Sequence, residues 1–170
     1  FAKVVTHAPA LNRITITLQG VAAHAGLHPE WGVNALVLAG KALAKVPTGR
    51  IDEETTANFG TIQGGAASNI VPEKVVIEAE VRSHSMEKLA RVTEEIKAIF
   101  SDTVAGWSDP TGSAKGAPKV EVEVRQDFAA MQLHPEDPVL RRVAAAARSI
   151  GMELSYEKAG GGSDANIFNG

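Results

Sequence analysis

A clear alternation of apolar and polar residues is found in Val75-Val76-Ile77-Glu78-Ala79-Glu80-Val81-Arg82. In an extended chain, the odd-numbered residues of this stretch face one side and the even-numbered residues face the other. A strand with only one apolar face is typical of an antiparallel sheet that covers a core on one side. We therefore expect residues 75–82 to form a half-buried strand.

Strand and helix patterns alternate on both sides of this stretch. Residues 13–18 and 120–125 alternate in the same way, and residues 55–65 give a weaker strand signal interrupted by glycine. Apolar residues recur at helical spacing from Pro29 to Pro47, and again after the expected N-cap Ser85. The order β-α-β-β-α-β predicts an α+β fold, the ferredoxin-like βαββαβ sandwich, with a four-stranded antiparallel sheet and two helices on one face.

The first predicted helix carries an apolar stripe that we expect to be buried, made of Val33, Leu36, Val37, Gly40, Leu43 and Ala44. Glycine in a helix interior costs about 1 kcal/mol relative to alanine, so Gly40 indicates close packing against a neighbour. Residues 101–118 are rich in Ser, Gly, Pro and Asp and predict a long surface loop.

The pattern changes between residues 127 and 137. Asp137 as N-cap and Pro138 at the first helical position predict an alanine-rich helix that ends at Gly151 and buries Leu140, Val143, Ala144 and Ala147. A short strand over residues 152–156 follows. We expect residues 11–127 to form one domain, and residues 1–10 and 128–170 to be segments of an incomplete α/β domain. The chain opens on Phe1 and stops soon after a glycine-rich turn, so we expect it to be part of a longer protein.

The composition argues against several classes of protein. With 170 residues, 44% of them apolar, the chain can bury a core of its own. The net charge of -3, without runs of like charge, argues against nucleic-acid binding. The absence of cysteine excludes disulfides and thiolate metal sites and fits a reducing compartment. No apolar stretch approaches the roughly 20 residues that span a bilayer, so we expect a soluble cytoplasmic protein with no membrane partner.

Two loops place a polar side chain among small or stiff residues. His24 lies in Gly20-Val21-Ala22-Ala23-His24-Ala25-Gly26, where a ligand or another subunit could approach its ring closely. Its imidazole could donate to a carbonyl oxygen or stabilise an oxyanion, and the alternative is a surface or capping histidine. Asn69 precedes Ile70-Val71-Pro72 and could bind a peptide or carboxylate. The alternative for Asn69 is a turn in which it bonds its own backbone.

Two further motifs could bind anions. Arg82 ends its strand on the polar face, and its guanidinium suits a planar carboxylate. The alternative is an ion pair with a neighbouring glutamate. The run Gly160-Gly161-Gly162-Ser163-Asp164-Ala165 offers backbone N–H groups at a predicted helix start, and the alternative is a flexible glycine run. No histidine pair has metal-ligand spacing, and the acidic residues 52–54 are interpreted as solvated.

Taken together and in this order, the motifs resemble a known family. Five motifs carry the resemblance: Gly20-x-x-Ala23-His24-Ala25-Gly26, Pro29-Glu30-x-Gly32-x-Asn34-Ala35, Ser68-Asn69-Ile70-Val71-Pro72, Glu80-Val81-Arg82-Ser83 and Gly160-Gly161-Gly162-Ser163-Asp164-Ala165. They are similar to the zinc exopeptidase superfamily that includes peptidase T, carboxypeptidase G, aminoacylase and succinyl-diaminopimelate desuccinylase. Residues 49–58 narrow the resemblance to peptidase T-like members.

The resemblance implies an enzyme that hydrolyses small peptides, with two zinc ions in a catalytic α/β domain and an inserted ferredoxin-like lid that forms a homodimer. It implies that His24 reaches the partner's active site and stabilises the oxyanion, and that Asn69 and Arg82 bind the carboxylate end of the substrate. Gly161, Gly162 and Ser163 would line the substrate cleft. The zinc ligands of the family have no counterpart in this chain, so we expect the chain alone to bind no zinc and to be inactive.

Two other functions are compatible with the sequence. One is a free-standing ferredoxin-like module that senses or binds a small ligand through His24 and Arg82, and the other is a purely structural dimeriser. In a dimer, we expect contact through the strand near residues 55–63 and the helix before it, because unpaired strand edges invite pairing.

Overall fold

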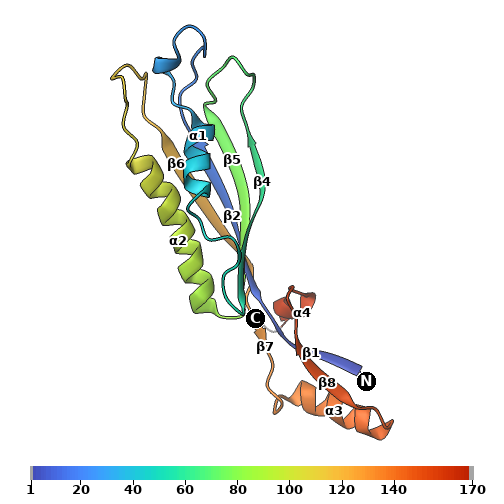
Figure 1. The fold of residues 1–170 in the computed structure, drawn as a ribbon. Helices are drawn as coiled ribbons and strands as arrows, with labels where there is room; N and C mark the ends of the chain where they lie inside the picture. The colour runs from blue at the N-terminus through green and yellow to red at the C-terminus, as the bar shows by residue number, and fades with distance from the viewer. Residues whose placement is uncertain (1, 169–170) are drawn as a thin grey trace.

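The structure, a computed structural model, describes residues 2–168 and contains two sheets. The larger sheet has the strand order β3-β4-β5-β2-β6, and the smaller has the order β7-β1-β8. Figure 1 shows the larger sheet and its helices at one end of an elongated molecule and the smaller sheet at the other. The strands are β1 (Ala2–Ala8), β2 (Ala10–Gln19), β3 (Gly49–Arg50), β4 (Thr55–Gly64), β5 (Lys74–Ser83), β6 (Lys119–Phe128), β7 (Met131–Gln132) and β8 (Leu154–Lys158). The helices are the short 3-10 helix η1 (Pro29–Trp31), α1 (Ala35–Leu43), α2 (Met86–Ala105), α3 (Pro138–Ser149) and α4 (Asp164–Phe168).

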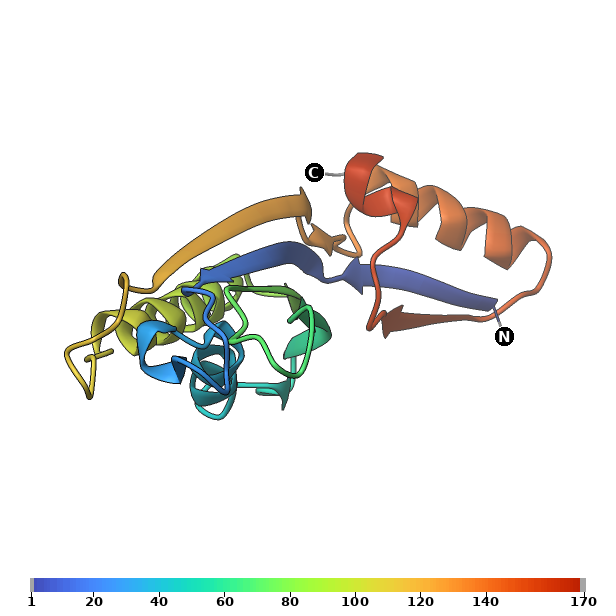
Figure 2. The ribbon, with the colours of Figure 1, turned by 90° about the horizontal axis from the view of Figure 1, so that it is seen from above.

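The larger sheet confirms the predicted ferredoxin-like fold. Its four long strands lie in the order β4-β5-β2-β6, and every neighbouring pair is antiparallel. Helices α1 and α2 lie side by side on one face of this sheet (Figures 1 and 2). The two-residue strand β3 pairs with the outer side of β4, so the sheet has five strands instead of the predicted four.

The core lies between the helices and the apolar face of the sheet. The predicted alternation holds in β2 and β5, which bury Ile14, Ile16, Leu18, Val75, Ile77 and Val81. Ser85 is the N-cap of α2, as predicted, because its side chain accepts a hydrogen bond from Lys88 N. This helix buries Leu89, Val92, Ile96 and Phe100 and runs on to Ala105, so the predicted loop begins later, at residue 106. The other face of the sheet, which carries Glu80 and Arg82, is left without helices.

Helix α1 begins later and buries a different face from the predicted one. Pro29 opens only the turn η1, and α1 begins after Asn34, whose side chain accepts from Val37 N. The buried residues of α1 are Ala35, Leu38, Ala39 and Ala42, whereas Leu36 and Val37 are exposed. A Cβ on Gly40 would meet no atom within 4 Å, so the prediction of close packing there was wrong. The contact between α1 and the sheet is made mainly by alanines, because their small side chains let the helix lie close to the sheet.

Strand β4 contains an irregularity that the sequence signal had only suggested. Its register against β5 shifts between Phe59 and Thr61, so one extra residue is accommodated there. As a result Ile62, and not Thr61, lies opposite the buried Ile77 on the helix-covered face. Ile62 is nevertheless 50% exposed, because no helix covers this end of β4.

The smaller sheet contains a strand that was not predicted. β1 pairs in parallel with β8 and antiparallel with β7, and β8 begins two residues later than expected. Helix α3 begins at Pro138, but the Asp137 carboxylate accepts from His134 N and not from the helix. Gly151, with a φ of 69°, ends the helix as predicted. Leu140 and Ala147 are buried, whereas Ala144 is only half-buried and Val143 is exposed, contrary to the prediction. Among residues 2–168, no helix combines the length and apolar character needed to cross a membrane.

Candidate functional site

The predicted site residues fall into two groups at opposite ends of β5. His24 and Asn69 lie in loops beside the Lys74 end of the strand, which we call the tip. Arg82 lies near the other end, which we call the base, together with the glycine-rich turn. A ten-residue strand spans about 30 Å, so one small molecule cannot contact both groups in the same protomer.

At the tip, backbone hydrogen bonds hold the two predicted loops together. His24 and Ile70 form an isolated β-bridge, in which Ala25 N donates to the Asn69 carbonyl at 2.9 Å. Val71 N donates to the Ala23 carbonyl at 2.8 Å. The side chains of His24 and Asn69 are both exposed, and within residues 2–168 that of Asn69 makes no hydrogen bond. The backbone contacts therefore bring an exposed imidazole and an exposed amide to neighbouring positions at the tip.

The His24 ring has one nitrogen that is already used. Gly26 N donates a hydrogen bond to His24 Nδ1 at 3.2 Å. A nitrogen that accepts carries no proton, so the neutral ring has its proton on Nε2. His24 is thus a local capping residue, as in the alternative interpretation, and is also a donor towards solvent. The arrangement suits donation to a carbonyl oxygen or an oxyanion.

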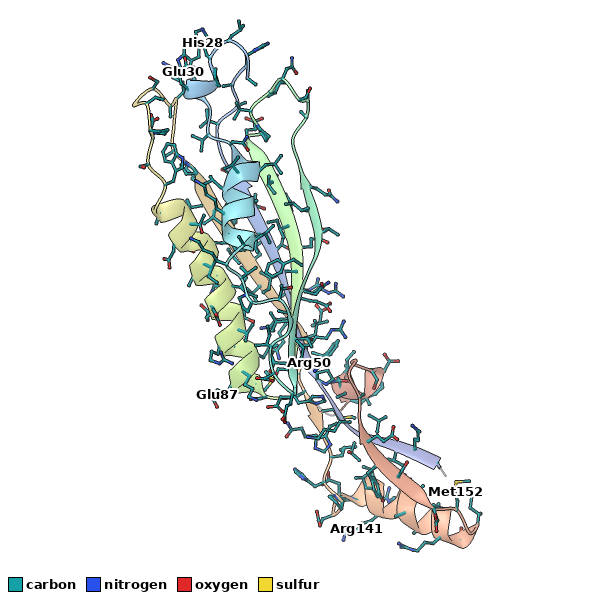
Figure 3. The ribbon with its side chains drawn as sticks, viewed as in Figure 1. His28, Glu30, Arg50, Glu87, Arg141 and Met152 are labelled. Carbon is teal, nitrogen blue, oxygen red and sulfur yellow. The ribbon has the colours of Figure 1, made fainter. Side chains whose placement is uncertain are left out.

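An aromatic stack supports the chain just after His24. The carbonyl of His24 accepts from Leu27 N and from His28 N at 3.2 and 3.0 Å. The ring of His28 stacks on Trp31 at a centroid distance of 3.8 Å, and Lys115 Nζ lies 4.9 Å from the Trp31 ring centre. His28 and Glu30 lie together at this end of the molecule in Figure 3. These contacts restrain the loop that carries His24.

At the base, two consecutive glycines lie over one row of the sheet. Leu11 on β2 is opposite Arg82 on β5 and Phe128 on β6, so these three residues form a row across three strands. A Cβ on Gly161 would lie 3.9 Å from Arg82 Nη1, and a Cβ on Gly162 would overlap the ring of Phe128. The turn therefore packs directly on the face of the sheet that has no helices.

Arg82 forms the ion pair that the alternative interpretation predicted. Its Nε and Nη2 donate to the two carboxylate oxygens of Glu80 at 2.8 and 3.2 Å. This bidentate pair occupies one edge of the guanidinium. Nη1 takes no part in it and lies beside Gly161, so it remains available to a ligand.

Asn166 was missed by the sequence analysis, although it holds the glycine-rich turn in place. It is only 1% exposed, and its side chain donates to the carbonyls of Pro9 and Ala129 at 3.2 and 2.8 Å. Its Oδ1 accepts from Ser163 N at 2.9 Å. The Ser163 N–H is therefore not available to a ligand. A serine followed three residues later by an amide side chain is similar to a capping box, which is the signal that could have revealed Asn166.

A cavity of about 760 Å³ opens beside Arg82, between the base of the larger sheet and the end of β8. Its basic lining residues are Arg50, Arg82, Lys88 and Lys158. Its acidic lining residues are Asp52, Glu53 and Glu54. Lys88 Nζ lies 2.7 Å from Glu54 and 3.3 Å from Asp52, and the hydrogen bond to Glu54 is the main cause of a raised pKa of Lys88. Arg50 lies at the level where the two sheets meet (Figure 3).

Three histidines and a lysine meet near this cavity. The pKa of His7 is lowered, first by burial and then by the positive charge of Lys158, with smaller contributions from His84 and His134. The sequence analysis found no histidine pair with metal-ligand spacing, because each of these histidines comes from a different segment. Within residues 2–168, no group of three or more His, Cys, Asp or Glu side chains could hold a metal ion.

A sequence model described as the peptidase dimerisation domain matches residues 10–108, from the start of β2 to just beyond α2. The chain belongs to the peptidase dimerisation domain family. This membership confirms the resemblance inferred from the five motifs.

Several larger proteins are similar to this chain. The Bacillus subtilis protein YqjE is 38% identical over 167 residues, which is 98% of the chain and 43% of YqjE. Aminopeptidase PepT from Bacillus cereus has a TM-score of 0.83 and 38% identity, over 98% of the chain and 42% of PepT. A tripeptidase from Staphylococcus aureus has a TM-score of 0.83 and 33% identity, over 98% of the chain and 42% of the tripeptidase. The chain spans less than half the length of each of these proteins.

Proposed function

We propose that this chain is the lid and dimerisation domain, with the start of the second catalytic half, of a metal-dependent exopeptidase that hydrolyses small peptides. Residues 11–127 are the lid, and residues 1–10 and 128–170 are segments of the catalytic α/β domain. The observation that carries the proposal is the packing of Gly161 against Arg82, which brings a carboxylate-binding side chain of the lid to the glycine-rich turn. Similarity to PepT and to a tripeptidase supports a peptide substrate. The cysteine-free sequence fits a cytoplasmic location.

The division of the site into two groups assigns roles to the two protomers of a dimer. Arg82, with Gly161, Gly162 and Ser163, binds the carboxylate end of the peptide within its own protomer. Asn69 cannot reach that peptide, since it lies a strand's length away. We therefore assign Asn69 and His24 to the partner's cleft, where the Nε2–H of His24 donates to the oxygen that becomes negatively charged during hydrolysis.

The dimer contact that best fits the structure uses β4 and α1. Beyond Ala57, the outer edge of β4 pairs with no strand in the described part of the chain. Leu36 and Val37 of α1 and Ile62 of β4 are exposed apolar residues on the same side of the sheet. Edge pairing of two copies satisfies the free backbone groups and covers these side chains. This is the edge that the sequence analysis expected.

We assign the metal-binding site to parts of the protein outside residues 2–168. The resemblance implies two zinc ions, but the described side chains contain no ligand cluster that fits them. Bound metal would supply activated water in the whole enzyme. The residues of this chain bind the peptide, orient it and donate a hydrogen bond.

The test is hydrolysis of tripeptides by the whole protein that contains this chain. We expect release of a terminal residue, loss of activity with a chelator and recovery with added zinc. A protein that binds small ligands without hydrolysing peptides would instead be the sensing module. A protein that only dimerises would be the structural alternative.

A further inference from the structure

We propose that Lys158 is a second carboxylate-binding residue, which acts with Arg82 and makes the enzyme prefer substrates that carry a carboxylate at this end. This inference rests on the proposed function and extends it to a residue outside the five family-like motifs.

The charge of Arg82 is already balanced within the protein. Glu80 accepts two hydrogen bonds from it, and both side chains are about 30% exposed, so solvent does not separate the pair completely. A carboxylate that approaches Nη1 also approaches the negative charge of Glu80. Arg82 therefore offers hydrogen-bond geometry to a ligand but little net positive charge.

The other cations of the cavity are also engaged. Lys88 lies between Glu54 and Asp52, at 2.7 and 3.3 Å. Arg50 Nη1 donates to the backbone carbonyl of Glu53 at 3.4 Å and thus lies against the acidic segment 52–54. Lys88 therefore offers no unbalanced positive charge to a ligand, and Arg50 has one of its donors engaged beside the acidic segment.

Lys158 differs from these three cations. It lines the same cavity, yet its side chain has no hydrogen bond or ion pair anywhere in residues 2–168. Lys3, on the neighbouring strand β1, is by contrast paired with Glu157 at 2.9 Å. The backbone around Lys158 is fixed, because Lys158 is in register with His7 and Ala159 N donates to the His7 carbonyl at 2.8 Å. A free ammonium on an ordered strand end is thus held at the wall of the cavity.

A carboxylate matches this arrangement better than a neutral group does. One carboxylate oxygen can accept from Arg82 Nη1 while the negative charge is neutralised by Lys158. A C-terminal amide would leave the positive charge of Lys158 without a counter-charge. It would also place its own N–H donors opposite Arg82 and Lys158, which are themselves donors. The ligand class is therefore a peptide carboxylate, supplied either by the C-terminus or by an acidic side chain.

The experiment measures peptide binding to the whole protein, with metal removed by a chelator so that no hydrolysis occurs. Calorimetry gives the Kd of trialanine, of trialanine amide, and of Ala-Ala-Glu amide, in which only the side chain is acidic. We expect Lys158→Met to raise the Kd of trialanine about tenfold and to leave that of trialanine amide unchanged. Lys158→Arg should keep the Kd within about threefold, because it keeps the charge. Lys3→Met, which removes a charge from the same sheet, is the control and should have no effect.

The outcomes separate the possibilities. A loss confined to trialanine assigns the C-terminal carboxylate, and a loss confined to Ala-Ala-Glu amide assigns the side chain; both support the proposal. Unchanged binding in Lys158→Met, or equal weakening of all three peptides, contradicts it. If a chelator abolished hydrolysis but Lys158→Met did not weaken peptide binding, this inference would be wrong and the proposed function would stand. Lys158-dependent binding without any hydrolysis by the metal-loaded protein would contradict the proposed enzyme and leave this inference standing.

Discussion

Arg82 Nη1 lies 3.9 Å from the position that a Cβ atom would occupy on Gly161. The next residue, Gly162, lies against the ring of Phe128, which belongs to a strand two places away from that of Arg82 in the sheet. Residues that are far apart in the sequence therefore form one continuous surface. A change in the glycine-rich turn must alter the surroundings of Arg82, and the reverse also holds.

Replacement of Gly161 or Gly162 by alanine should affect the stability of the protein to different extents. In Gly162→Ala the new Cβ overlaps the Phe128 ring, so the ring or the turn must move, and we expect a loss of about 1–3 kcal/mol in the free energy of unfolding. In Gly161→Ala the Cβ makes an ordinary contact, and the loss should stay below about 0.5 kcal/mol. Urea unfolding of both variants measures the difference. Phe128→Leu should partly restore Gly162→Ala, and equal losses in the two glycine variants would contradict the described packing.

Under the proposed function, His24→Ala should lower kcat by about 10²-fold in the whole enzyme, because one donor to the oxyanion would be lost. The melting temperature should not change, since the ring is exposed and its one hydrogen bond is local. Leu27→Ala is the matched control: the residue is exposed in the same loop and carries no donor. Steady-state kinetics on a tripeptide would show the difference, and an unaltered kcat in His24→Ala would remove the catalytic role.

A charge on the free edge of β4 should separate the proposed dimer. Ile62→Lys places an ammonium where a second copy would pack, so we expect a monomer in sedimentation velocity at micromolar concentration. Val124→Lys is the control, because Val124 is 40% exposed on the same face of the sheet but on β6, the opposite edge. Dissociation by the β6 variant and not by the β4 variant would move the interface to the other edge.

The junction between the two sheets should lose stability in mild acid. Burial and the charge of Lys158 hold the pKa of His7 below its ordinary value of 6.5, so the folded protein binds fewer protons than the unfolded chain over the interval between the two values. Stability therefore rises with pH across this interval, and it falls as the pH drops below about 6.5. Urea midpoints measured from pH 7.5 to pH 5 should show this decline.

Substitution of His7 tests the origin of the decline. His7→Gln should flatten the dependence of the urea midpoint on pH, whereas His24→Gln, which removes an imidazole at the tip, should preserve it. An unchanged slope in His7→Gln would assign the acid sensitivity to other groups.

The fold was predictable where local patterns agree with long-range packing. The alternation in β2 and β5 and the Ser85 cap of α2 are local signals, and the structure confirms them. The buried face of α1 was not predictable in this way, because its alanines pack on the sheet while the larger Leu36 and Val37 remain outside. Strand β3 is too short to give a pattern, and the irregularity after Phe59 reverses the alternation within β4.

The residues of the candidate site could be proposed one by one from the sequence, but their arrangement could not be predicted. The motifs identified His24, Asn69, Arg82 and the glycine-rich turn, yet nothing local indicates that the tip and the base are separated by the length of β5. The contacts of Asn166 with Pro9 and Ala129 join segments that are distant in sequence, so they follow only from the fold. The charge balance around Lys158 likewise depends on which carboxylates lie nearby, and this is a property of the assembled cavity.

The distance between the tip loops and Arg82 has a genetic consequence if each active site draws on both protomers. An allele that lacks the His24 imidazole and another that lacks the Arg82 guanidinium would each give an inactive homodimer. Their mixed dimer would contain one site with both groups and one site with neither. Co-expression of the two defective alleles should thus rescue about a quarter of the normal sites through random assortment of subunits.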